Sequence, residues 1–218
     1  MENVEGIQKN KDGVLKVFPA MTLDELYTHG DCPAVIKEAI GFSAVWQVRN
    51  ETSVEKAVSA PSLMPELTIA LLATEAQVLL EDGATVPMAE VVKRSGKRAK
   101  MAALLLSDGV CAATARLGVS PTSDPIVAVA ASIDVKNGVI NDVRVALTGV
   151  WSGRKWLAES VQSFKGGEAG KLDVAQVAAA VEKEVKPKGD HLGSVEYRRA
   201  MAGVLTRQAL EACMKGVK

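Results

Sequence analysis

The sequence is poor in aromatic residues, histidine and cysteine, and it has no excess of charge of either sign. Of 218 residues, 4% are aromatic, two are histidine and three are cysteine, and 26 basic side chains balance 26 acidic ones. A net charge of zero argues against a protein that binds nucleic acid through a basic face. Cys32, Cys111 and Cys213 lie too far apart for a disulfide framework or a zinc or iron–sulfur motif. We therefore expect buried or unreactive thiols and no metal site.

Long apolar segments are also missing. The first 13 residues are polar and lack the apolar stretch of a signal peptide. The longest apolar runs, such as residues 126–131, are much shorter than the roughly 20 residues that a membrane span requires. The basic segment 93–100 has no interleaved aromatic residues and is interpreted as a linker. These features predict a soluble cytoplasmic protein that binds neither a membrane nor nucleic acid.

The common catalytic motifs are absent as well. The sequence contains no GxSxG, GxxxxGKS/T, GxGxxG or HExxH pattern. His29 and His191 each lie beside a turn residue without a histidine or cysteine partner, so both are interpreted as surface residues. We therefore assign no catalytic residue, and whether the chain is part of an enzyme stays open. Trp46, Trp151 and Trp156 are interpreted as packing residues.

The first half mixes strands with short helices. A strand is predicted at 14–18, and Thr22 with Glu25 predicts a capping box at the start of a helix. Further helices are predicted to begin near Pro33 and Pro65, and a second strand is predicted at 76–80.

The second half has a clearer pattern. Residues 126–135 are predicted to form a strand, because Val127, Val129, Ala131, Ile133 and Val135 fall on one face. Asn137-Gly138 favours a type I′ turn into a return strand. Two helices are predicted to follow, at 174–185 and at 194–214. The second is expected to bury Tyr197, Met201, Val204 and Leu205 and to leave Arg198, Arg199 and Arg207 on the surface. The chain is predicted to be an α+β protein with two lobes, 1–95 and 96–218.

The C-terminal segment carries a longer pattern. Residues 190–199 read Asp-His-Leu-Gly-Ser-Val-Glu-Tyr-Arg-Arg. This run resembles the closing helix of the FAD-binding (medium) subunit of molybdenum hydroxylases, the family of carbon monoxide dehydrogenase and xanthine dehydrogenase. The preceding segment 143–150 resembles the family's strand R-I/V-A-L-G-G-V. Segments 15–26, 48–50, 65–80 and 86–88 resemble further family motifs in the same order, so the resemblance covers almost the whole chain.

The resemblance implies a fold, a cofactor and partners. The fold would be the second lobe of a flavin-binding domain followed by a C-terminal antiparallel sheet packed by helices. In such proteins FAD passes electrons from iron–sulfur clusters to an acceptor, and the protein supplies the cradle. The partners implied are a molybdopterin-binding large subunit and an iron–sulfur small subunit.

The chain departs from the family at the cradle. It begins where the family's second lobe begins, so the resemblance implies an N-terminally truncated member without the first glycine loop. In the second cradle segment, Glu55-Lys56 stands where the family has paired glycines, and Phe18 stands in the place of another glycine. The residues that match the motif, and so the candidate cofactor-binding residues, are Ser53, Val54, Pro61 and Ser62, with Glu66 the match for a family aspartate.

These replacements are unfavourable for a flavin diphosphate. Paired glycines permit positive φ and let backbone amides approach the phosphates. A side chain in that conformation costs roughly 1–2 kcal/mol. A carboxylate about 4 Å from a phosphate charge costs up to about 4 kcal/mol at an effective dielectric constant of 20. We therefore expect weakened or lost FAD binding.

Three functions remain open. The first is a structural or electron-transfer-complex subunit with weakened or lost FAD binding. The second is a functional FAD-binding electron-transfer subunit whose missing lobe comes from another chain. The third is an unrelated binding module on the same scaffold. Arg198, Arg199 and Arg207 are interpreted either as partner contacts or as ion pairs on a helix surface.

Overall fold

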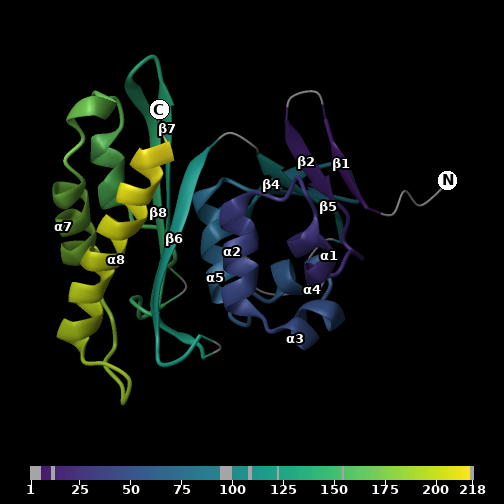
Figure 1. Cartoon of the computed structure of the whole chain (residues 1–218), viewed down its shortest axis with the longest axis horizontal. Coiled ribbons are helices and arrows are strands. Elements are labelled where there is room, and N and C mark those ends of the chain that lie inside the picture. Colours follow the sequence, from purple (N-terminus) through teal and green to yellow (C-terminus); the bar gives the residue numbers. More distant parts are fainter. Residues whose placement is uncertain are drawn as a thin grey trace. The chain divides into compact units, whose positions relative to one another are not determined.

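The computed structural model describes residues 6–10, 13–93, 100–107, 110–121, 123–153 and 155–216. The chain combines helices with two antiparallel sheets, which confirms the α+β prediction (Figure 1). It forms two compact units, Met1–Gly109 and Val110–Lys218. Residues 94–99 of the predicted linker lie outside the described residues.

The first unit contains a five-stranded antiparallel sheet with the order β1-β2-β5-β3-β4. Its strands are β1 (Ile7–Lys9), β2 (Val14–Val17), β3 (Gln77–Leu80), β4 (Thr85–Pro87) and β5 (Met101–Ser107). The central strand, β5, pairs with both β2 and β3. The first unit therefore extends beyond the lobe boundary expected at residue 95, because a division there would remove the central strand from its sheet.

Among the described residues of the first unit, six helices complete it. They are α1 (Leu23–Thr28), α2 (Ala34–Ser43), α3 (Trp46–Glu51), α4 (Val54–Ser59), α5 (Pro65–Ala73) and α6 (Met88–Val91). The capping box at α1 is confirmed, since the Glu25 amide donates to the Thr22 hydroxyl at 3.2 Å and the Thr22 amide donates to the Glu25 carboxylate at 2.8 Å. Helix α5 is buried on every side from Glu66 to Ala73 and packs against α2. These two helices lie side by side in the first unit (Figure 1).

The second unit contains a three-stranded antiparallel sheet, β6-β7-β8. Its elements are β6 (Cys111–Gly118), β7 (Pro125–Lys136), β8 (Val139–Thr148), two short 3₁₀ helices (Ser160–Phe164 and Ala169–Lys171), α7 (Val174–Glu184) and α8 (Val195–Gly216). Asn137 and Gly138, which join β7 to β8, have φ values of 53° and 76°. Positive φ at both positions confirms the predicted type I′ turn.

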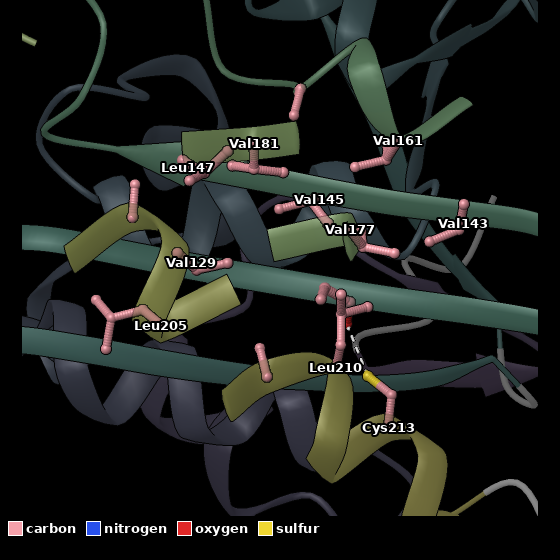
Figure 2. Close-up of a cluster of buried hydrophobic side chains, with 14 of the residues drawn as sticks. Val129, Val143, Val145, Leu147, Val161, Val177, Val181, Leu205, Leu210 and Cys213 are labelled. Atoms are coloured by element: carbon pink, nitrogen blue, oxygen red, sulfur yellow. Dashed lines mark hydrogen bonds between the residues drawn. The ribbon is translucent and has the colours of Figure 1, made fainter. Parts of the chain in front are cut away.

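Helices α7 and α8 cover one face of this sheet, and apolar side chains fill the space between them (Figure 2). The predicted face of β7 supplies Val127, Val129, Ala131 and Ile133 to this core, and each is at most 1% exposed. Val177 and Val181 of α7 and Leu210 of α8 meet them from the helices. Burial of a valine or leucine side chain contributes roughly 1.5–3 kcal/mol, so this cluster is the main source of the unit's stability.

The buried face predicted for α8 is confirmed at Leu205, which is 6% exposed, and at Met201, which packs against the core, but it is wrong at Tyr197 and Val204. Tyr197 and Val204 are 41% and 43% exposed, whereas Ala202, Thr206 and Ala209 are fully buried. Small residues face inward because α8 lies close to its neighbours, and a Cβ on Gly203 would lie 2.8 Å from the Glu182 carboxylate of α7. A search for large apolar side chains therefore finds only part of the buried face of this helix.

Candidate functional site

The segment that matches the flavin cradle lies against the turn that leads into α1. Residues 52–55 and residues 19–23 run antiparallel, with a bridge between Thr22 and Ser53. Three backbone hydrogen bonds join them, from the amides of Leu23, Val54 and Glu55 to the carbonyls of Thr52, Met21 and Pro19, at 2.9, 2.8 and 3.1 Å. The start of α4 is thereby fixed to the start of α1.

The leading amides of α4 all have acceptors within the chain. Those of Val54 and Glu55 donate to the carbonyls just described. The Lys56 amide donates to the Ser53 hydroxyl at 3.2 Å, and the Ala57 amide donates to the Ser53 carbonyl at 3.0 Å. A diphosphate is held in such loops by amides that have no other acceptor. As they stand, the amides of residues 54–57 do not fit a dinucleotide diphosphate.

Residues 54–57 bond their amides within the chain without backbone strain. Among the described residues, the non-glycine residues with positive φ are Glu75 and Asn137. Glu55 and Lys56 are helical, because Ser53 caps α4 one residue before its start. The left-handed strain expected for this pair is therefore wrong. The Glu55 carboxylate belongs to the first turn of α4, where a negative charge is favourable to the helix itself.

The four candidate cofactor-binding residues lie in two pairs. Ser53 and Val54 stand at the start of α4, and the Val54 side chain is only 1% exposed. Pro61 and Ser62 lie beyond the other end of this helix, which is about 9 Å long. The Pro61 carbonyl accepts a hydrogen bond from the Thr68 hydroxyl at 3.1 Å, and Ser62 is exposed. Helix α4 separates the two pairs.

Glu66, the match for the family aspartate, faces the interior of the first unit. It is 3% exposed, and its carboxylate accepts a hydrogen bond from the Ser43 hydroxyl at 3.2 Å. The same hydroxyl accepts from the Leu67 amide at 3.0 Å. Glu66 therefore helps to join the end of α2 to the start of α5 and is not presented to a ligand at the surface.

Arg49, in the segment that resembles the family's I-R-N motif, joins α3 to α1. Its Nε donates to Asp24 at 2.9 Å, and its guanidinium lies 4.3 Å from the centroid of the Tyr27 ring. Its Nη1 also donates to the Ala44 carbonyl at 3.3 Å. The motif arginine thus joins α3 to α1 and to the end of α2.

In the second unit, Arg198 is buried, so the prediction that it lies on the surface is wrong, although it does form an ion pair, with Asp190. It is 5% exposed, and its Nη2 donates to both Asp190 oxygens at 2.8 and 2.7 Å. Its Nη1 donates to the carbonyls of Ile126 and, at 3.0 Å, Gly149. The bond from Arg198 lowers the pKa of Asp190. This arginine joins the start of α8 to the first strand of the hairpin and to the residue that follows the second.

The motif glycine and serine complete that arrangement. Gly149 has a φ of 80°, and a Cβ there would collide with the Ile126 carbonyl and lie 3.3 Å from Arg198. The Ser194 hydroxyl accepts from the Tyr197 amide at 3.1 Å at the start of α8. Sequence reasoning missed the pairing of Asp190 with residue 198, although both belong to the motif that carries the resemblance.

The other two arginines of α8 differ from Arg198. Arg207 pairs with Glu211 one turn along the exposed face, at 2.7 Å. This is the ion pair on a helix surface that was one of the two interpretations. Arg199 is half-buried.

The remaining chemistry-bearing groups give no second site. Cys32, Cys111 and Cys213 are free thiols, and burial raises the pKa of Cys32 and of Cys213 to about 12. Within the described ranges, no three histidine, cysteine, aspartate or glutamate side chains gather closely enough to hold a metal ion. No helix among these residues has the length and hydropathy needed to cross a membrane. Contrary to the packing interpretation, Trp46 is 61% exposed.

Comparison with known proteins extends the sequence resemblance. The family model described as CO dehydrogenase flavoprotein C-terminal domain matches residues 123–213. The uncharacterized protein YgfM of Escherichia coli K12 is 24% identical over 204 residues, which cover 94% of this chain and 74% of YgfM.

Solved structures share the fold of both units. Quinoline 2-oxidoreductase from Pseudomonas putida 86 matches 97% of this chain and 78% of its own, with a TM-score of 0.80 and 16% identity. Carbon monoxide dehydrogenase from Hydrogenophaga pseudoflava matches the same shares, with a TM-score of 0.79 and 22% identity. At these identities the structural likeness shows the fold, and the family match adds the kind of domain. Residues 123–213 therefore match the C-terminal domain of CO dehydrogenase flavoproteins, and the chain as a whole has the fold of these two solved structures.

Proposed function

We propose that this chain is the medium subunit of a molybdenum-hydroxylase assembly and acts there as a structural or electron-transfer-complex subunit with weakened or absent FAD binding. Its partners in this proposal are a molybdopterin-binding large subunit and an iron–sulfur small subunit. The observation that carries the proposal is the contrast between a C-terminal unit of the flavoprotein type and an α4 segment whose leading amides are already bonded.

The exposed apolar side chains of the first unit support a role in assembly. Val45, Trp46, Val48 and Leu63 are between 39% and 69% exposed, and all four fall within residues 45–63. Tryptophan is enriched among the residues that dominate binding energy at protein interfaces. We therefore assign α3 and the turn before α5 to partner contact.

Purification of the tagged chain from its own cells tests the proposal. The expected result is that the chain retains two further subunits and that the preparation contains molybdenum and iron. Trp46→Ser should weaken this association by about 30-fold or more, as expected when an interface anchor is removed. The control is Val119→Ser, which removes an exposed apolar side chain from the second unit. A chain that purifies alone and without either metal would contradict the proposal.

A functional FAD-binding subunit, whose missing lobe is supplied by another chain, is the second candidate. The description of the matched domain as part of a flavoprotein favours it. This candidate predicts a yellow assembly that holds one flavin for each copy of this chain. The first candidate predicts an assembly in which this chain carries no flavin.

A further inference from the structure

We propose that the start of α4 is closed to dinucleotides by the chain's own backbone, so that neither FAD nor any other dinucleotide diphosphate binds along residues 53–57. This inference rests on the proposed function in one respect, because it takes this segment as the counterpart of the flavin cradle. It adds the atoms that close the site: the carbonyls of Pro19 and Met21 and the hydroxyl and carbonyl of Ser53.

The acceptors that close the site are difficult to displace. A phosphate that took the amides of Val54 and Glu55 would break two of the three bonds that hold residues 52–55 to residues 19–23. Val54 and Leu23, on either side of this contact, are 1% and 0% exposed. Movement of residues 19–23 or of residues 52–55 away from this contact would expose apolar side chains that are now buried. The closure is therefore coupled to the packing of the first unit.

The Ser53 side chain takes the position that a phosphate oxygen would need. A serine hydroxyl at this position accepts from the amide three residues later, which is the usual way for a helix to satisfy one of its leading amides. The Glu55 carboxylate adds a negative charge in the first turn, and the exposed Lys56 adds a positive one. The pair brings no net positive charge to attract a diphosphate. Bonded amides rather than charge are the main obstacle.

Amide hydrogen exchange on the full chain tests the closure directly. The amides of residues 54–57 are expected to exchange slowly without ligand, because each is bonded. Neither FAD nor inorganic pyrophosphate should change their rates. In parallel, FAD fluorescence should show no binding to this segment with a dissociation constant tighter than about 1 mM. Rapid exchange of these amides without ligand, or slowing of their exchange when FAD or pyrophosphate is added, would overturn the proposal.

A charge variant tests whether FAD is excluded by the bonded amides or by repulsion between Glu55 and the diphosphate. Glu55→Gln removes the carboxylate charge and leaves every amide of the segment with its acceptor, so FAD should still not bind. Glu51→Gln, at the exposed end of α3, is the matched control. If Glu55→Gln alone created FAD binding with a dissociation constant near 10 µM or below, repulsion would be the cause and the closure by bonded amides would be wrong.

Failure of the closure at residues 53–57 can be distinguished from failure of the proposed assembly role. Co-purification with partner subunits decides whether the chain belongs to an assembly, whatever its flavin content. If FAD binds to the chain while exchange at residues 54–57 stays unchanged, the flavin lies elsewhere and the closure stands. If these amides become protected by FAD in a chain that also co-purifies with its partners, the closure fails and the assembly role remains.

Discussion

The family-like segments of the two units differ in the contacts that they make. In the second unit, Asp190, Arg198 and Gly149 of the family-like segments make contacts that hold α8 on the hairpin, and Ser194 caps the start of α8. In the first unit, the segment that matches the flavin cradle is a capped helix whose leading amides are bonded within the chain. The difference teaches that the family-like segments of the second unit serve the packing of the fold, whereas the leading amides of the cradle-like segment already have acceptors within the chain.

The largest effect is expected at Gly149. Gly149→Ala places a Cβ against the Ile126 carbonyl and forces a side chain into positive φ. We expect a loss of about 3 kcal/mol or more in the free energy of unfolding, measured by urea denaturation. Gly153→Ala is the control, since nothing lies within 4 Å of a Cβ there. Equal unfolding midpoints for the two variants would show that the fold does not require glycine at position 149.

Arg198→Met tests the buried arginine itself. Methionine keeps much of the side chain's volume but leaves the carbonyls of Ile126 and Gly149 without this donor. We expect a loss of about 2–3 kcal/mol in the free energy of unfolding. Arg207→Met, which breaks only an exposed pair on the same helix, should change it little. If the two variants lost the same stability, the motif arginine would be an ordinary surface residue.

A third contact of the second unit gives a pH-dependent test. Glu184 accepts hydrogen bonds from Lys155 at 2.7 Å and from the amides of Glu159 and Ser160 at 2.9 Å each. Burial raises the pKa of Glu184, but the hydrogen bonds from Lys155 and from the segment 159–160 outweigh burial and lower it from 4.5 to about 2. The ionised carboxylate therefore stabilises the folded chain.

The direction of the pH effect follows from that lowered pKa. The contribution of Glu184 is fully present above pH 4.5 and disappears as the pH falls towards 2. At neutral pH, Glu184→Gln should cost about 2 kcal/mol after allowance for solvent screening. Urea denaturation of both proteins across this pH range measures the difference. A gap between them that stayed constant down to pH 2 would show that ionisation of Glu184 contributes nothing.

The smallest effect is expected in the first unit. Ser53→Ala removes the acceptor of the Lys56 amide and should lower the free energy of unfolding by about 1 kcal/mol. It should also speed amide exchange at Lys56. Ser62→Ala, at the exposed position beyond α4, is the control and should leave both measurements unchanged. Identical exchange at Lys56 in the parent chain and in Ser53→Ala would show that Ser53 does not cap α4.

Local signals predicted much of the fold. The capping box at Thr22 and the Asn137-Gly138 turn are short-range patterns whose geometry depends on neighbouring residues alone. The small residues on the inward face of α8 were not predictable in this way, because their burial depends on how closely α7 approaches Gly203. The position of β5 in the first sheet was missed for the same reason, since strand pairing joins residues far apart in the sequence.

The candidate site was predictable only in part. The sequence located the cradle segment through Ser53 and Val54, and it identified Glu55-Lys56 as the departure from paired glycines. It could not show that the segment becomes a helix without strain. Nor could it identify Pro19 and Met21, which act through backbone carbonyls, because any residue type supplies such an acceptor.

The most direct test is an experimental structure of this chain, purified with its partners and held in excess FAD. The account predicts that the amides of residues 54–57 keep Met21, Pro19 and Ser53 as their acceptors, with no flavin beside residues 53–62. A diphosphate within hydrogen-bond distance of the Glu55 and Lys56 amides would contradict it.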